Sequence, residues 1–337
     1  MGKARRPLLL ALLIVGALVG GSSAASAMGT DSATPTATLR RVALGVSMKA
    51  DRSLPAVDHF TTSVGRAPAL WSIWSTWGGD DRAFPDTTFL NGLQTRGVVP
   101  MVVWQPVDPA HFDGDAYRYR RIIAGDFDPY IRHWAQAAKA WGGRVLLRFA
   151  HEMNGYWFPW SPGRFDNTPA GFIKAWRHVW KIIRGPAPGG IGATNVKFVW
   201  SPGSPCPSCT PYSLIYPGDK YVDYVGFTAF NWGTGYSSWV PMVKKFTPAM
   251  KALAKVSSKP VIAAETGSSK LGGDKAAWIR LGYPAVYTRF PSIKAIVYFN
   301  VDMRPVHQPN WLLSAPAAAL TEYRTVVAQP RFHGTIP

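Results

Sequence analysis

Residues 144–160 read RVLLRFAHEMNGYWFPW. The stretch opens with a short apolar run, which is typical of a buried β-strand, and the run ends in two polar residues, His151 and Glu152. Four aromatic residues follow within the next eight positions. A buried strand that ends in polar side chains recurs along this chain, and the recurrence indicates the fold.

Seven further runs of this kind, each closed by Gly, Pro or polar residues, lie at 42–47, 69–75, 98–106, 196–203, 222–232, 260–268 and 293–302. Segments of helical composition separate several of them, at 129–142, 169–185 and 239–256. Eight strands that alternate with helices in one uninterrupted stretch predict an α/β fold, a single-domain (β/α)8 TIM barrel. A doubly wound open sheet is the alternative, because periodicity cannot show closure. No Gly-rich phosphate turn follows the first run, which counts against that alternative.

The first 27 residues have the anatomy of a secretory signal peptide: three basic residues, an apolar run at 8–19 and the small triplet Ala-Ser-Ala at 25–27. The run is shorter than the roughly 20 residues that span a bilayer, so an uncleaved membrane anchor is the less favoured alternative. We expect cleavage after Ala27, a disordered leader at 28–40 and the barrel domain at 41–337. We therefore expect a secreted or cell-wall-associated protein without stable membrane insertion.

The formal net charge is +18, and it falls to +15 when the three basic residues of the signal peptide are removed. The remaining basic residues are scattered rather than arranged in a stripe, so we expect no nucleic-acid partner. Such a charge favours loose attraction to an anionic cell wall.

The chain has two cysteines, Cys206 and Cys209, in the segment SPCPSCT. In an oxidising compartment this spacing favours a small loop disulfide. A zinc site would need two further ligands, and a redox CxxC motif would be expected to open a helix near a βαβ unit. We therefore expect no metal at these cysteines, and we expect no cofactor because two glutamates, described next, can supply the acid, base and nucleophile themselves.

Two glutamates stand at the ends of the fourth and seventh runs, Glu152 and Glu265. In a TIM barrel the functional groups gather at the carboxyl ends of the strands, where these two can face each other. Retaining cleavage of a glycosidic bond requires two carboxyl groups about 5 to 5.5 Å apart, one protonated in a drier setting and one ionised. The aromatic residues after Glu152 favour Glu152 as the acid/base and Glu265 as the nucleophile. Arg148 lies on the same side of its run as Glu152 and is expected to pair with a carboxylate.

The segment RFAHEMNGYWFPW, residues 148–160, closely resembles the acid/base motif of glycoside hydrolase family 26, and AAETGSS, residues 263–269, is similar to the nucleophile segment of that family. Weaker matches follow the family order at 199–204, 216–233 and 297–302. The resemblance implies a retaining enzyme on a (β/α)8 barrel. Members of the family are mostly endo-acting on β-1,4-mannans, and some cut mixed-linkage β-glucan or β-1,3-xylan. It also implies that Glu152 is the acid/base, Glu265 the nucleophile and His151 a residue that positions the sugar.

The sequence departs from the family pattern on the sixth strand. Phe230 stands where the family usually has a tyrosine that donates a hydrogen bond to the nucleophile, and Thr228 replaces a frequent aspartate. A missing donor leaves the nucleophile less well oriented, unless another residue such as Asn231 replaces it.

Further residues near the strand ends are candidates for sugar binding. Aromatic rings can stack on sugars or pack in a core, and amides can bind hydroxyl groups or hold a tight loop. The candidates are His151, Asn154, Trp157, Trp232, Asn231, Trp104 and Tyr298.

The sequence thus predicts a secreted, monomeric, retaining endo-glycosidase with a polysaccharide substrate, β-1,4-mannan first. Mixed-linkage β-glucanase and β-1,3-xylanase activities are alternatives within the family. A non-catalytic carbohydrate-binding barrel is suggested by Phe230, and a hydrolase of an anionic wall glycan is suggested by the net charge.

Overall fold

The computed structural model describes residues 39–49 and 51–336, which belong to one compact unit that begins at Leu39. The predicted signal peptide lies outside the described residues, as does the predicted leader apart from Leu39 and Arg40. The Arg40 guanidinium stacks on the Tyr287 ring, 3.9 Å from its centre, so Arg40 is part of the compact unit.

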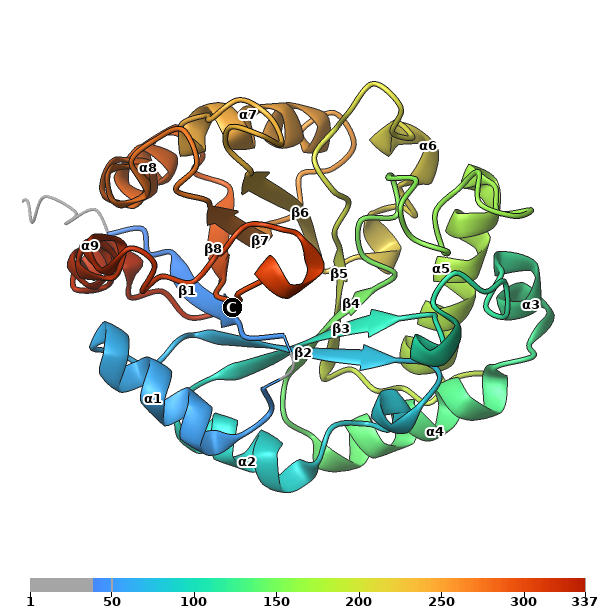
Figure 1. The fold of residues 1–337 in the computed structure, drawn as a ribbon. Helices are drawn as coiled ribbons and strands as arrows, with labels where there is room; N and C mark the ends of the chain where they lie inside the picture. The colour runs from blue at the N-terminus through green and yellow to red at the C-terminus, as the bar shows by residue number, and fades with distance from the viewer. Residues whose placement is uncertain (1–38, 50, 337) are drawn as a thin grey trace, which may run out of the picture. The chain divides into compact units, whose positions relative to one another are not determined.

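Eight parallel strands form a closed barrel in chain order (Figure 1). They are β1 (Ala43–Ser47), β2 (Leu70–Thr76), β3 (Val99–Gln105), β4 (Val145–Phe149), β5 (Val196–Trp200), β6 (Tyr224–Asn231), β7 (Val261–Ser268) and β8 (Ile293–Phe299). The barrel closes because β1 pairs with β8, with Ala43 opposite Ala295. The predicted TIM barrel is confirmed, and the open sheet is excluded.

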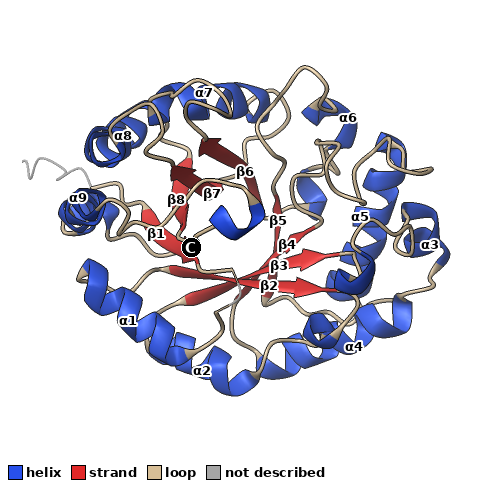
Figure 2. Cartoon of the chain, in the orientation of Figure 1, coloured by secondary structure: helices blue, strands red, loops and turns tan. Residues whose placement is uncertain are grey.

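Helices surround the barrel (Figure 2). They are α1 (Leu54–Val64), α2 (Thr87–Thr95), α3 (Tyr119–Ala124), α4 (Asp128–Trp141), α5 (Pro169–Arg184), α6 (Tyr212–Ile215), α7 (Met242–Leu253), α8 (Lys275–Arg289) and α9 (Ala317–Val327). Among the described residues, no helix is both long and apolar enough to cross a membrane.

Helix α5 shows how the sequence sets these elements. The Thr168 side chain accepts a hydrogen bond from the Gly171 N–H at the start of the helix, and Pro169 occupies the first turn, where it costs no hydrogen bond. Apolar residues at helical spacing, including Phe172, Trp176 and Val179, are buried. The helix therefore packs one apolar face toward the core, while Lys174, Arg177 and Lys181 lie on its exposed face.

The core has two layers because successive strand residues point to opposite faces. An interior cluster fills the barrel with residues such as Met101, Leu146 and Val297. An outer cluster between the strands and the helices contains their neighbours, such as Val102 and Leu147. Ile336, near the end of the chain, is buried in the interior cluster.

Candidate active site

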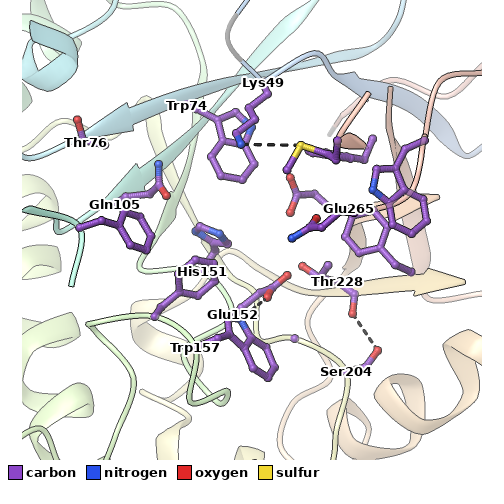
Figure 3. Close-up of a pocket in the computed structure, with 18 of the residues that line it drawn as sticks. Lys49, Trp74, Thr76, Gln105, His151, Glu152, Trp157, Ser204, Thr228 and Glu265 are labelled. Carbon is purple, nitrogen blue, oxygen red and sulfur yellow. Dashed lines mark hydrogen bonds between the residues drawn. The ribbon is translucent and has the colours of Figure 1, made fainter. Parts of the chain in front are cut away.

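A cavity of about 850 Å³ opens at the carboxyl ends of the strands (Figure 3). Apolar and aromatic side chains form much of its wall, and six charged side chains also line it: Lys49, Arg52, Asp81, Glu152, Lys245 and Glu265. Figure 3 shows Glu152 and Glu265 pointing into this one cavity, one from the end of β4 and one from β7.

A bulge in β7 directs Glu265 into the cavity. Phe227 of β6 pairs with Ala263, but the next residue, Thr228, pairs with Glu265, so Ala264 is an extra residue in β7. Ala263 lies in the outer core cluster, and regular alternation from it would turn Glu265 toward the helices. The extra residue reverses the alternation and aims the carboxylate at the mouth of the barrel.

Glu265 is buried, with 2% of its surface exposed, and pairs with an equally buried arginine. Arg148 Nη1 lies 3.0 Å from Glu265 Oε2, and Arg148 Nη2 donates a hydrogen bond to Thr228 Oγ1 at 2.6 Å. Burial raises the pKa of the Glu265 carboxyl, the Arg148 guanidinium opposes this rise, and the nearby Glu152 carboxyl adds to it. The ion pair that the sequence predicts for Arg148 is confirmed.

Glu152 is held differently, on a loop residue just beyond β4. Its φ is +53°, a left-handed conformation that is uncommon for a residue other than glycine. Its backbone N–H donates to the Ser201 carbonyl at 2.9 Å, and Trp157 Nε1 donates to Glu152 Oε2 at 2.8 Å. Glu152 is half-buried. The drier setting therefore belongs to Glu265, not to Glu152 as predicted, because the rings of Tyr156 and Trp157 beyond Glu152 are exposed.

His151 is buried between aromatic rings at the floor of the cavity, with its ring 5.2 Å from that of Trp74 and 4.8 Å from that of Phe158. Trp160 Nε1 donates to the His151 carbonyl at 2.8 Å and fixes its backbone. Burial, with the Arg148 charge as a second cause, holds the pKa of His151 well below its usual range. The imidazole is therefore neutral at neutral pH and can exchange hydrogen bonds with a substrate.

Comparison with known proteins gives this geometry a family. Residues 107–269 match the model described as glycosyl hydrolase family 26. The chain is 31% identical over 334 residues to Endoglucanase H of Acetivibrio thermocellus, and this alignment covers 96% of this chain and 33% of that protein. The chain belongs to glycoside hydrolase family 26.

Shorter and more distant similarities agree with the family 26 assignment. The chain is 33% identical over 200 residues to a mannan endo-1,4-beta-mannosidase of Bacillus subtilis, and this alignment covers 53% of this chain and 54% of that protein. A family 26 beta-mannanase from Bacteroides ovatus shares the fold, with a TM-score of 0.65 at 15% identity over 88% of this chain and 91% of that chain. The chain spans about one third of the length of Endoglucanase H and about half of that of the Bacillus mannosidase.

The position on β6 at which the sequence departs from the family 26 pattern, Phe230, lies in the cavity wall. Phe230 packs on Trp311, 4.8 Å between ring centres. Glu265 Oε1 is buried without a hydrogen-bond partner among the described residues. Asn231 does not supply the missing donor, because its Nδ2 donates to Ser268 Oγ at 2.8 Å and its Oδ1 accepts from Val240 at 2.8 Å. The prediction that Asn231 binds substrate is wrong, since it is buried and its amide holds a loop.

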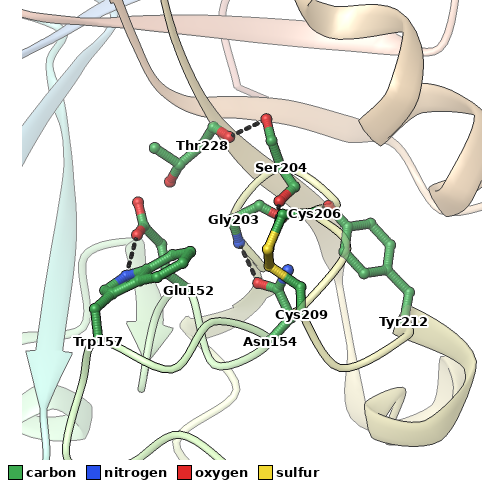
Figure 4. The surroundings of a disulfide bond; sticks show 9 residues. All are labelled: Glu152, Asn154, Trp157, Gly203, Ser204, Cys206, Cys209, Tyr212 and Thr228. Carbon is green, nitrogen blue, oxygen red and sulfur yellow. Dashed lines mark hydrogen bonds between the residues drawn. A yellow bond between two sulfur atoms is a disulfide. The ribbon is translucent and has the colours of Figure 1, made fainter. Parts of the chain in front are cut away.

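The predicted disulfide is confirmed, and it lies near Glu152 (Figure 4). Cys206 and Cys209 close a short loop that follows β5. Asn154 ties this loop to the Glu152 segment: its Oδ1 accepts from the Gly203 N–H at 2.7 Å, and its carbonyl accepts from Thr210 at 2.7 Å. Asn154 is buried, so it holds a tight loop and the prediction that it binds sugar is wrong.

Two aromatic residues predicted to bind substrate lie in the core instead. Trp104 and Tyr298 are both fully buried in the outer cluster. Trp104 Nε1 donates to the Tyr130 hydroxyl at 2.9 Å, and the Tyr298 ring lies 5.9 Å from that of Tyr323 in α9. The prediction is wrong for both, because each points toward the helices.

The neighbouring residues Gln105 and Phe299 line the cavity in their place. Strand alternation carries this signal: Gln105 shares a face with Met101, and Phe299 with Val297, both of which fill the barrel interior.

Other aromatic residues do line the cavity. Trp157, 41% exposed, and the half-buried Trp232 are placed as a sugar platform requires, so their predicted roles remain open to test. The cavity also contains two tryptophans that the sequence did not single out, Trp74 of β2 and Trp311 after β8. Alternation along β2 could have identified Trp74, whereas Trp311 lies in a loop that has no such pattern.

No group of three or more His, Cys, Asp or Glu that could hold a metal ion is found within residues 39–49 and 51–336. For chemistry the site offers two carboxylates, the arginine behind one of them, and the neutral histidine between aromatic rings.

Proposed function

We propose that this chain is a retaining endo-glycoside hydrolase that cleaves a β-linked polysaccharide by double displacement. One observation carries the proposal: Glu152, just beyond β4, and Glu265, within β7, line one cavity and differ in burial and in partners. Arg148 beside Glu265 favours the ionised carboxylate that a nucleophile needs, whereas Glu152 is half-buried beside the Trp157 N–H, where it can exchange a proton with substrate and water.

In the first step, the Glu265 carboxylate attacks the anomeric carbon while Glu152 gives its proton to the departing glycosidic oxygen. In the second step, Glu152 takes a proton from water, and this water displaces Glu265 from the sugar. Arg148 favours the ionised form of Glu265, and Trp157 holds Glu152 Oε2 by a hydrogen bond. The half-buried position of Glu152 gives water access to it for the second step.

The substrate proposed first is β-1,4-mannan. It is supported by similarity to proteins named mannan endo-1,4-beta-mannosidase from Bacillus subtilis and Caldalkalibacillus mannanilyticus. Mixed-linkage β-glucan comes second, because the relative aligned over 96% of this chain is named Endoglucanase H. β-1,3-Xylan comes third, because the family resemblance suggests it as a further substrate.

We also propose that the chain is exported and acts as a monomer outside the cell or at the cell wall. The basic, apolar and small-residue pattern of residues 1–27 supports export, and the Cys206–Cys209 disulfide suits an oxidising compartment. The positive net charge supports loose attraction to anionic wall polymers. Sequencing of the amino terminus of secreted protein should give Met28, and retention of residues 1–27 would contradict the proposal.

A non-catalytic binding barrel is a second candidate, favoured by the missing hydrogen bond at Glu265 Oε1. The test is product release by the chain from Met28 onward, on β-mannan, mixed-linkage β-glucan, cellulose and β-1,3-xylan, with Glu265→Ala alongside. Cleavage that vanishes in Glu265→Ala, with a first product of retained anomeric configuration by NMR, supports the proposed mechanism. Binding without cleavage of any polymer supports the second candidate instead.

A further inference from the structure

Lys245, near the start of α7, is a cation of the cavity that the proposed mechanism does not use. It lies in the wall of the cavity that also contains both glutamates, and it is half-buried. Burial lowers the pKa of its ammonium, and no nearby charge contributes to this shift. A charge withdrawn from water without an opposite charge carries a free-energy cost that a bound anion can offset.

The other cations around the cavity have partners. Arg52 Nη1 lies 2.9 Å from Asp81 Oδ1, and Arg148 pairs with Glu265. Lys49 Nζ lies 3.9 Å from Met303 Sδ and 5.9 Å from the centre of the Trp74 ring, and its charge also acts on Glu265. In the part of the chain that the structure describes, the Lys245 ammonium has neither an ion pair nor a hydrogen bond.

We propose that the cavity takes an acidic β-glycan and that Lys245 binds a carboxylate on one of its sugars, an inference that rests on the proposed glycosidase function. One ammonium is a compact single charge, and it matches the single negative charge of the carboxylate that an acidic sugar carries. Partial burial strengthens such a pair, because the screening by water is reduced.

This inference differs from attraction by the net charge. The mature protein carries a formal charge of +15 over scattered residues, which attracts any polyanion and weakens with salt. Lys245 instead acts at one place in the cavity. Lys244 provides a matched control, because it precedes Lys245 in the same helix, has the same charge and is exposed outside the cavity.

The experiment measures binding in the catalytically inactive Glu265→Gln background, so that turnover is not required. Soluble β-mannan and mixed-linkage β-glucan, each with and without partial carboxymethylation, are titrated at 0.15 M salt. On the backbone that binds, we expect the carboxymethylated form to bind about five- to tenfold more tightly than the neutral form. Lys245→Met should abolish this difference, whereas Lys244→Met and Lys245→Arg should keep it.

Equal losses of preference in Lys245→Met and Lys244→Met would reduce the effect to general charge and overturn the inference. A neutral backbone that the Glu265→Gln variant binds as tightly as its acidic form, and that the parent chain cleaves, would also overturn the inference while leaving the proposed function intact. Absence of binding to all four polymers would contradict the inference and the two substrates proposed first, β-1,4-mannan and mixed-linkage β-glucan.

Discussion

Glu265 and Glu152 line the same cavity, but the molecule holds them in different ways. Glu265 sits inside a strand, is buried and pairs with Arg148 at 3.0 Å. Glu152 sits on a loop residue with positive φ, is half-buried and is held by one hydrogen bond from Trp157. A nucleophile must meet one carbon along a fixed line, whereas an acid/base must reach both a leaving oxygen and water. For the proposed roles, the contrast teaches that a buried strand position fixes the nucleophile, whereas a half-buried loop position leaves the acid/base within reach of water.

The largest effect is expected from loss of the strand carboxylate. Glu265→Ala should lower kcat on a cleaved polymer by at least about 10⁴-fold, because no covalent intermediate can form. The chain offers a matched control in Glu322→Ala, since Glu322 is the third glutamate of the chain and pairs with Arg280 in α8, away from the cavity. Product release should be unchanged in the control. Substantial activity in Glu265→Ala would assign the nucleophile elsewhere.

Loss of the loop carboxylate should be less severe and should depend on the leaving group. Glu152→Ala is expected to lower kcat on polymer by about 10² to 10⁴-fold, the usual contribution of general acid–base catalysis. An aryl glycoside with an acidic phenol needs little protonation, so its first step should be much less affected. Burst kinetics with such a substrate measure that step. An equal loss on both substrates would argue against Glu152 as the proton donor.

Arg148→Met tests the buried ion pair through stability. Because burial raises the pKa of Glu265 above its unfolded value, ionised Glu265 costs folding free energy, and this cost disappears as the pH falls and the carboxyl takes up its proton. Arg148 offsets the cost only while Glu265 is charged. The variant should therefore lose about 3 to 5 kcal/mol of unfolding free energy at pH 7 and clearly less at pH 4.

Urea titrations at pH 7 and pH 4 measure this difference. The double variant Arg148→Met/Glu265→Gln has no buried charge at this place, so it should recover most of the stability at pH 7. If Arg148→Met lost the same free energy at both pH values, packing rather than charge would explain the role of Arg148.

The smallest effect is expected at the loop hydrogen bond. Trp157→Phe keeps an aromatic ring but removes the N–H donor to Glu152, and should lower kcat by about tenfold. Trp232→Phe is a control, because Trp232 also lines the cavity and has no hydrogen bond to either glutamate. A reduced kcat in Trp157→Phe alone would support the role of this hydrogen bond in holding Glu152. Equal reductions of kcat in both variants would contradict that role.

The fold could be predicted because each strand is a short buried run closed by Gly, Pro or polar residues. Eight such runs that alternate with helices in one domain are typical of a (β/α)8 barrel. Both glutamates could be found because each ends such a run. Trp104 and Tyr298 were misplaced because position at a strand end does not say which face a side chain occupies. Alternation from Met101 and Val297 would have selected Gln105 and Phe299.

Other features of the site could not be predicted. The bulge at Ala264 has no sequence signal, although regular alternation would turn Glu265 away from the cavity. Trp311 and Lys245 reach the cavity from a long loop and from a helix, and their paths depend on contacts between distant parts of the chain. The burial of Glu265 rather than Glu152 likewise depends on how deep each side chain lies, which local composition does not determine.

The position of Ile336 has a consequence for the timing of folding. This residue, late in the chain, fills the barrel interior together with side chains from β1 and the strands between. A chain that lacks β8 has neither the strand pair that closes the barrel nor Ile336 beside the interior side chains. Closure of the barrel therefore comes after the synthesis of β8 and of the segment that carries Ile336, later than the pairing of β1 with β2.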